Sequence, residues 1–340
     1  MDATVLQRIQ HGLQEKRQNI SDWLNNTPPA KKQVMTGPCC DEDVQSQLIT
    51  IDQSLDQIEN NTFGVCDVCH RYVDAPLLEM DYTTCVCLDH YSEKELRQLE
   101  TELELSQVFQ KALLPHSAPD IPGLVLAAYS RPAQILGGDY YDFIQYRDGL
   151  YGLAIADAVG HGVAASMFMT SLQTALHTLA PENDSPADVI QRINRFYIHN
   201  VHMTSFLTVF LSRYDPAAHT LTYGNAGHNP PIVYRSQSRK VDWLQPTGAG
   251  LGFIEDYTIQ PETISLSAGD VIVLYTDGVV EATNAQGDLF GYERLEKAVT
   301  QNAFLPAQEL LKVIRQRLHD FVQAQTLADD TTILIGKISA

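Results

Sequence analysis

The sequence predicts a chain that mixes β-strands with α-helices, and three features support this. Val271–Tyr275 is a continuous apolar run with the length and composition of a buried strand. Leu153–Ala156 is a second such run, and it leads into a Gly-rich turn followed by an apolar helix. Near the N-terminus, apolar residues recur at roughly helical spacing instead. We therefore expect a helical N-terminal part and a larger part that contains both strands and helices.

Three helices are predicted in the first third of the chain. The first extends from about Thr4 to Leu24, and the Asn-Asn-Thr-Pro-Pro segment at 25–29 ends it. The second begins near Asp41. The third, Ser92 to Leu114, carries an apolar stripe near heptad spacing, which is typical of a core contact or a coiled-coil seam. This stripe consists of Leu96, Leu99, Leu103, Val108 and Ala112.

The cysteines predict a metal site between the second and third helices. All six lie in the first quarter of a chain without a recognisable secretory signal, which favours metal binding over disulfides. Cys66 and Cys69 form a CxxC pair, and Cys87 with His90 forms a CxxH pair after seventeen intervening residues. Three thiolates and an imidazole suit one tetrahedral, structural Zn²⁺ ion. Cys85 is the alternative fourth ligand.

Aspartates lie at the ends of the strand-like runs in the last 200 residues. They are Asp139, Asp157, Asp277 and the pair Asp329 and Asp330. Carboxylates gathered at strand ends would repel one another unless hard divalent cations lay between them. The turn after Asp157 can add the Ala158 carbonyl as a further oxygen ligand. The pattern therefore predicts a metal-dependent hydrolase.

Other polar residues near these runs are secondary candidates. His161 and His228 could orient the metal ligands or donate a proton, or could only hold their loops through hydrogen bonds. Arg131 could meet a phosphate, or could be an ordinary surface arginine. From Leu105 onward the sequence has no cysteine, which excludes a cysteine nucleophile in that part.

Length and charge limit the class of protein further. A catalytic part of about 230 residues leaves about 105 for the N-terminal part, so two units are expected. The net charge of −19 disfavours nucleic acid and anionic membrane as partners, because both bind basic patches. A membrane span needs about 18 consecutive apolar residues, and we find neither such a run nor a signal peptide. We expect a cytoplasmic protein.

Seven motifs in order resemble the bacterial SpoIIE/RsbU branch of the metal-dependent PPM (PP2C-like) serine/threonine phosphatases. The resemblance covers roughly residues 105–338. The motifs are Leu113-Leu114-Pro115, Arg131-Pro132-Ala133, Gly137-Gly138-Asp139, Asp157 to Gly162, Asn225 to Pro231, Thr276-Asp277-Gly278, and Asp329-Asp330-Thr331-Thr332. The resemblance implies an α/β (α+β) sandwich of two antiparallel β-sheets flanked by helices.

The same resemblance implies two Mn²⁺ or Mg²⁺ ions at one end of the sandwich. Asp157 would bridge them, and the Ala158 carbonyl, Asp139, Asp277 and Asp329 would complete the ligand set. Asp330 is the second choice within its pair, because related enzymes place the ligand first and often have Asn second. Such a pair of ions can activate a shared water for attack on phosphorus without a covalent intermediate.

Residues 52–91 resemble the zinc finger of the DksA/TraR family, whose best-known members bind RNA polymerase. This sequence departs from the family in having His90 where a fourth cysteine is usual. The corresponding helical hairpin would have its tip near 38–43, which is acidic but lacks the usual motif. The resemblance implies a helical hairpin with a zinc knuckle ahead of the catalytic part.

Together these features predict three segments: a zinc-finger module (1–91), a helical linker (92–114) and a phosphatase domain (115–340). The expected substrate is a phosphorylated anti-sigma-factor antagonist in a partner-switching signalling pathway. A homodimer through the linker helix is also expected, because related enzymes often dimerise there. The alternative is an interaction protein that docks on RNA polymerase or another regulator and carries a vestigial phosphatase domain.

Overall fold

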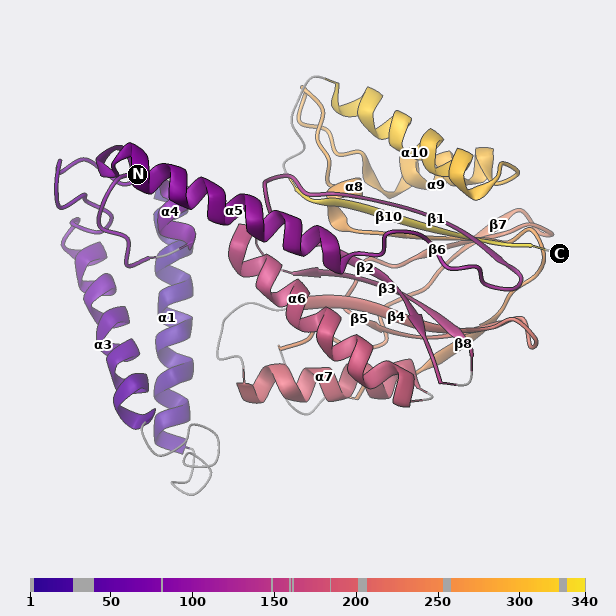
Figure 1. Ribbon diagram of the computed structural model, residues 1–340, viewed down its shortest axis with the longest axis horizontal. Coiled ribbons are helices and arrows are strands. Elements are labelled where there is room, and N and C mark those ends of the chain that lie inside the picture. The colour runs from indigo at the N-terminus through magenta and orange to yellow at the C-terminus, as the bar shows by residue number, and fades with distance from the viewer. Residues whose placement is uncertain are drawn as a thin grey trace. The chain divides into compact units, whose positions relative to one another are not determined.

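The computed structural model of the protein describes most of the chain (Figure 1). The described residues are 3–26, 40–80, 82–147, 149–158, 160, 162–183, 185–200, 207–252, 258–323 and 329–339. They form two compact units, and the division falls between Glu102 and Leu103, inside the expected linker helix. No helix in these ranges is both long and apolar enough to cross a membrane.

The smaller unit is built on two helices, α1 (Ala3–Asn26) and α3 (Cys40–Glu59), as expected from their apolar spacing. Leu13 and Ile20 of α1 are buried with Ile51 and Ile58 of α3 in one apolar cluster. The segment 27–39, which includes part of the expected hairpin tip, lies outside the described residues. Two short helices follow, α4 (Ala75–Met80) and the 3₁₀ helix η1 (Leu88–His90).

Helix α5 (Glu93–Leu113) coincides with the expected linker helix. Ser92 and Glu95 form a reciprocal cap at its start. The Ser92 N–H donates to the Glu95 carboxylate at 2.8 Å, and the Glu95 N–H donates to the Ser92 hydroxyl at 3.3 Å. This cap explains why the helix begins at this residue.

Two five-stranded antiparallel sheets form the centre of the larger unit, which confirms the expected fold class. The first sheet has the order β1-β10-β9-β6-β7 and the second has the order β2-β3-β4-β5-β8. In chain order the strands are β1 (Leu124–Arg131), β2 (Tyr140–Gln145), β3 (Tyr151–Ala158), β4 (Leu207–Asp215), β5 (Thr220–Ala226), β6 (Ile232–Arg235), β7 (Lys240–Trp243), β8 (Glu262–Ser265), β9 (Val271–Tyr275) and β10 (Thr331–Ile338).

Helices cover the outer face of each sheet (Figure 1). The second sheet packs against α6 (Gly162–Leu179) and α7 (Pro186–Asn200), with the 3₁₀ helix η2 (Ala180–Glu182) after α6. The first packs against α8 (Asp277–Val280), α9 (Gly291–Asn302) and α10 (Ala307–Val322). Residues such as Ile155, Phe210 and Leu274 fill the space between the sheets. Because β3 and β9 are buried on both faces, they are apolar almost throughout.

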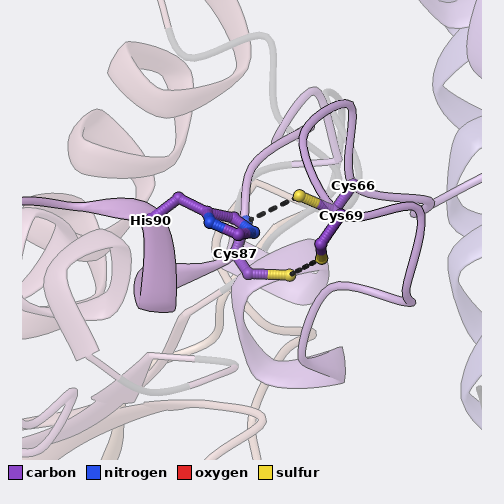
Figure 2. Close-up of side chains that lie close together, drawn as sticks. All are labelled: Cys66, Cys69, Cys87 and His90. Carbon is purple, nitrogen blue, oxygen red and sulfur yellow. Dashed lines mark hydrogen bonds between the residues drawn. The ribbon is translucent and has the colours of Figure 1, made fainter.

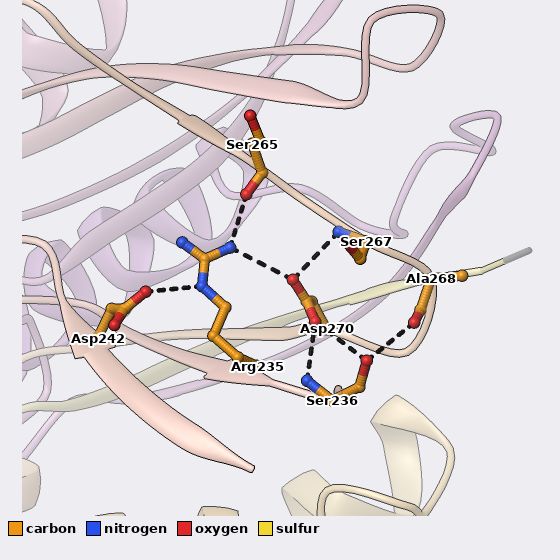
Figure 3. Close-up of polar contacts among 7 residues, drawn as sticks. All are labelled: Arg235, Ser236, Asp242, Ser265, Ser267, Ala268 and Asp270. Carbon is orange, nitrogen blue, oxygen red and sulfur yellow. Dashed lines mark hydrogen bonds and ion pairs between the residues drawn. The ribbon is translucent and has the colours of Figure 1, made fainter. Parts of the chain in front are cut away.

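A polar network ties the two sheets together at one end (Figure 3). Asp270, which precedes β9, is buried and accepts the Ser236 N–H at 2.8 Å. Arg235 of β6 donates to Asp270 at 3.3 Å and to the Ser265 carbonyl of β8 at 2.6 Å. Since Asp277 follows the other end of β9, the network closes the sandwich at the end remote from the acidic residues.

Candidate metal centres

The five aspartates predicted as metal ligands come from both sheets but meet at one end of the sandwich. On the second sheet, Asp139 precedes β2 and Asp157 lies near the end of β3. On the first, Asp277 follows β9, and Asp329 and Asp330 precede β10. Burial, and then the negative charges of the other four, raise the pKa of Asp157 to about 10. Antiparallel pairing within each sheet and the packing of the two sheets therefore gather residues that are far apart in the sequence.

The electrostatics of this cluster suit divalent cations. Burial and the charge of Asp330 raise the pKa of Asp139 well above its usual range. Burial and the charge of Glu281 raise the pKa of Asp277. Ionised carboxylates in this arrangement oppose one another, and a cation placed among them would remove the repulsion. A donor set made of oxygen atoms alone also matches what Mn²⁺ and Mg²⁺ prefer.

Asp329 and Asp330 differ sharply in their surroundings. Asp330 is buried, and its carboxylate accepts the Ala133 N–H at 2.7 Å and the Gly138 N–H at 2.5 Å. Asp329 is exposed, and its carboxylate accepts the Asp330 N–H at 2.8 Å. Asp330 therefore holds the loop that carries Asp139, whereas Asp329 presents its carboxylate outward.

Close packing accounts for the paired glycines. Neither Gly137 nor Gly138 has a positive φ, so a left-handed backbone conformation does not explain them. A Cβ on Gly137 would lie 2.5 Å from a carboxylate oxygen of Asp330. A Cβ on Gly138 would lie 2.8 Å from the Ala158 carbonyl oxygen, a candidate metal ligand. The glycines let the loop approach both oxygens closely.

Two polar residues support this loop, and the sequence did not predict this role for either of them. The buried Thr276 hydroxyl donates to Asp139 at 2.7 Å and accepts the Thr332 N–H at 3.0 Å. Gln110 of α5 is buried, and its amide pairs with the Gly137 backbone, donating at 2.6 Å and accepting at 3.2 Å. Gln110 could have been identified from the sequence as a polar residue next to the apolar stripe of the linker helix.

The secondary candidates have different positions. His228 is buried, and its Nδ1 lies 2.9 Å from the Thr208 hydroxyl. Burial lowers the pKa of His228 to about 4, so its imidazole is neutral at pH 7 and suits a positioning role better than proton donation. Arg131 is exposed at the end of β1. His161 lies outside the described residues.

A second candidate centre lies in the smaller unit (Figure 2). The metal-binding atoms of Cys66, Cys69, Cys87 and His90 all lie within 4.8 Å of one another. The Cys69 and Cys87 sulfurs are 3.9 Å apart, and the Cys87 N–H donates to the Cys66 sulfur at 3.4 Å. Hydrogen bonding from the Arg71 backbone lowers the pKa of Cys69 to about 7, which favours a thiolate. The exposed Cys85 is not part of this group.

Comparisons with known proteins agree with this fold. Residues 147–339 match the family model described as Stage II sporulation protein E (SpoIIE). The chain is 32% identical over 250 residues to the phosphoserine phosphatase RsbU of Bacillus subtilis, and the aligned region covers 73% of each chain. It is 29% identical to the phosphoserine phosphatase RsbP of the same organism, over 54% of this chain and 46% of that one. The solved SiaA-PP2C domain of Pseudomonas aeruginosa superimposes with a TM-score of 0.63 at 20% identity, over 72% of this chain and 99% of that chain.

Proposed function

Because the chain belongs to the SpoIIE family, we propose that it is a metal-dependent serine/threonine protein phosphatase. The observation that carries this proposal is the acidic cluster at one end of the two-sheet sandwich. The alternative, an interaction protein with a vestigial phosphatase domain, is not favoured, because the predicted carboxylates are all present and lie together.

The proposed ligands of two Mn²⁺ or Mg²⁺ ions are those that the family resemblance implies, and their gathering at one end of the sandwich supports the proposal. Asp157 would be shared, and Asp139, Asp277, Asp329 and the Ala158 carbonyl would complete the set. When bound, such ions lower the pKa of a water and neutralise charge on a phosphoryl group. In this assignment Asp330 positions the loop rather than binding metal, since backbone N–H groups occupy both of its oxygens.

Neighbouring residues hold the proposed metal ligands in position. The Thr276 hydroxyl donates a hydrogen bond to the Asp139 carboxylate, and this bond fixes the rotamer of Asp139. His228 holds Thr208, whose hydroxyl donates to the Asp157 carbonyl at 3.4 Å, so this pair supports the strand that carries Asp157. From Leu105 onward no cysteine is present, which excludes a cysteine nucleophile in this part of the chain.

Substitution of Asp157 tests this function. Asp157→Ala should abolish Mn²⁺-dependent hydrolysis of a phosphoserine peptide and weaken Mn²⁺ binding in calorimetry. Asp188→Ala, which removes an exposed carboxylate from the start of α7, is the matched control and should retain both properties. More than a tenth of wild-type turnover in Asp157→Ala would contradict the assignment.

Similarity to the phosphoserine phosphatases RsbU and RsbP supports a phosphoserine substrate, and the family resemblance suggests which protein carries it. We expect the phosphatase to act on a phosphorylated anti-sigma-factor antagonist of a partner-switching pathway. Loss of phosphate from such a protein, encoded near this chain, can be followed by mass spectrometry. An antagonist that stays phosphorylated while a phosphoserine peptide is hydrolysed would reject the substrate but keep the activity.

The smaller unit is proposed to bind one structural Zn²⁺ through Cys66, Cys69, Cys87 and His90, as in the DksA/TraR zinc finger that it resembles. Its support is the convergence of four metal-binding atoms. Cys66→Ser should lose about one zinc per chain and unfold residues near the site, because metal binding to a small module supplies folding free energy. Cys85→Ser should keep the zinc. Elemental analysis that finds no zinc in the wild-type protein would reject the site.

The proposed segments are a zinc-finger module (1–91), a helical linker (92–114) and a phosphatase domain (115–340).

The protein is also proposed to form a homodimer through the linker. A cavity of about 1270 Å³ between α5, α6 and α7 supports this proposal. It is lined by the exposed apolar side chains of Val108, Phe109 and Met167. Exposed apolar patches of this kind mark interaction surfaces. Phe109→Glu should yield monomers in light scattering, and Leu289→Glu, at an exposed apolar residue elsewhere, should not.

A further inference from the structure

A second cavity, of about 500 Å³, lies between helix α10 and the adjoining ends of β1 and β10. Arg131 of β1 lines it together with Lys312, Arg315 and His319 of α10. The described residues that line it include no aspartate or glutamate. In a chain with a net charge of −19, this cavity is a local concentration of positive charge.

Arg315 is held in a fixed position in the cavity. Its guanidinium carbon lies 3.7 Å from the centre of the Tyr129 ring, a stacking contact that leaves the N–H donors available. Among the described residues, neither Arg315 nor Arg131 forms an ion pair with a carboxylate of the chain. Lys312, in contrast, is 2.8 Å from Glu309. Two guanidinium groups therefore offer unused donors to an external anion.

Thr331 provides an independent sign of a ligand. It lines the same cavity, its side chain is fully buried, and its hydroxyl has no hydrogen-bond partner among the described residues. A buried hydroxyl without a partner costs free energy, so such groups usually meet a ligand or water. A ligand that reached the cavity floor would supply the missing partner.

The cavity adjoins the candidate catalytic centre. Thr331 directly follows Asp330, and Arg131 pairs with Thr331 across the β1–β10 ladder. The backbone N–H of Ala133, two residues after Arg131, donates to Asp330. Residues that flank a phosphoserine at the acidic cluster are therefore within reach of Arg131 and the other cations of the cavity.

We propose that this cavity binds an acidic segment of the phosphoprotein substrate, through carboxylates that lie close to the phosphoserine in its sequence. The proposal rests on the phosphatase function above. Arg131 lies on β1, whereas Lys312 and Arg315 lie on α10, so the cations come from two separate elements. Cations spread over two elements match several carboxylates along a peptide better than one compact anion such as free phosphate.

Two phosphoserine peptides test the proposal. They are identical except that one has aspartates and glutamates around the phosphoserine and the other has asparagines and glutamines. Steady-state kcat/KM is measured for both peptides with the full-length wild type, Arg315→Gln and Arg317→Gln. Arg317 is the matched control, because it lies on the same helix but donates to Gln301 at 2.9 Å outside the cavity.

The wild type and Arg317→Gln should prefer the acidic peptide by roughly tenfold in kcat/KM, mainly through KM, and less at high salt. Arg315→Gln should reduce this ratio to about twofold or less. Equal kcat/KM for the two peptides in the wild type, or an unchanged ratio in Arg315→Gln, would overturn the proposal.

A binding measurement separates this inference from the catalytic function. Fluorescence anisotropy of the unphosphorylated acidic peptide, recorded in EDTA, needs no turnover. The wild type and Arg317→Gln should bind this peptide at least fivefold more tightly than Arg315→Gln does. Failure to hydrolyse any phosphoserine peptide would reject the proposed function, while this measurement still decides on the cavity. Displacement of the peptide by millimolar inorganic phosphate would identify a small-anion site and reject the acidic segment.

Discussion

Replacement of Asp330 by alanine should destabilise the protein much more than replacement of the adjacent Asp329. The Asp330 carboxylate accepts two short hydrogen bonds from the Ala133 and Gly138 N–H groups, at 2.7 and 2.5 Å. Each hydrogen bond to a charged acceptor contributes about 1.5–3 kcal/mol, so their loss costs about 3–6 kcal/mol. Removal of one charge from the acidic cluster also relieves the repulsion by which Asp330 raises the pKa of Asp139, so the net loss is smaller than this sum. The expected net loss is about 2–4 kcal/mol.

Asp329→Ala is the control for this prediction. Asp329 is exposed and accepts the Asp330 N–H, so its loss should cost less than about 1 kcal/mol. Urea denaturation in EDTA, followed by circular dichroism, measures the free energy of unfolding without a metal contribution. Calorimetry should show that Asp329→Ala, although stable, binds Mn²⁺ more weakly. Equal stability of the two variants, or a less stable Asp329→Ala, would refute the division of roles.

Three further predictions concern the surroundings of the acidic cluster. Gly278→Ala should reduce both stability and turnover, because its Cβ would lie 1.9 Å from the Asp330 carbonyl oxygen; full activity would contradict this packing. Gln110→Leu should lower kcat while the protein stays folded, because Gly137 loses both amide hydrogen bonds; unchanged kcat at saturating Mn²⁺ would exclude a link from α5 to the loop. The folded-state pKa of His228 is about 4, below that of a free imidazole. The contribution of His228 to the free energy of unfolding should therefore be fully present above about pH 6.5, and should decline by up to about 3 kcal/mol as the pH falls to 4. The decline should remain in the difference between the wild-type and His228→Gln unfolding free energies over the same range, and a difference that does not vary with pH would contradict a buried, neutral imidazole.

Periodicity in the sequence was enough to locate the main elements. The apolar stripes predicted α1, α3 and α5, and the buried runs predicted β3 and β9 close to their observed bounds. Local chemistry decides these elements, because a helix or a doubly buried strand needs apolar residues at fixed intervals. The same holds for the CxxC and CxxH pairs, whose short spacing already brings each pair of donors together.

Only the tertiary structure could assign different tasks to residues of the same type. Asp329 and Asp330 are adjacent and chemically identical, yet one is exposed and the other is enclosed by backbone N–H groups almost 200 residues away in the sequence. The explanation of Gly137 and Gly138 required the same long-range contacts. The cavity beside Arg315 also depends on helix α10 packing against the end of β1. The sequence by itself thus determined which residues form elements and which carry charge. The packing of two sheets decided which charges meet, because burial and hydrogen bonding depend on neighbours that are distant along the chain.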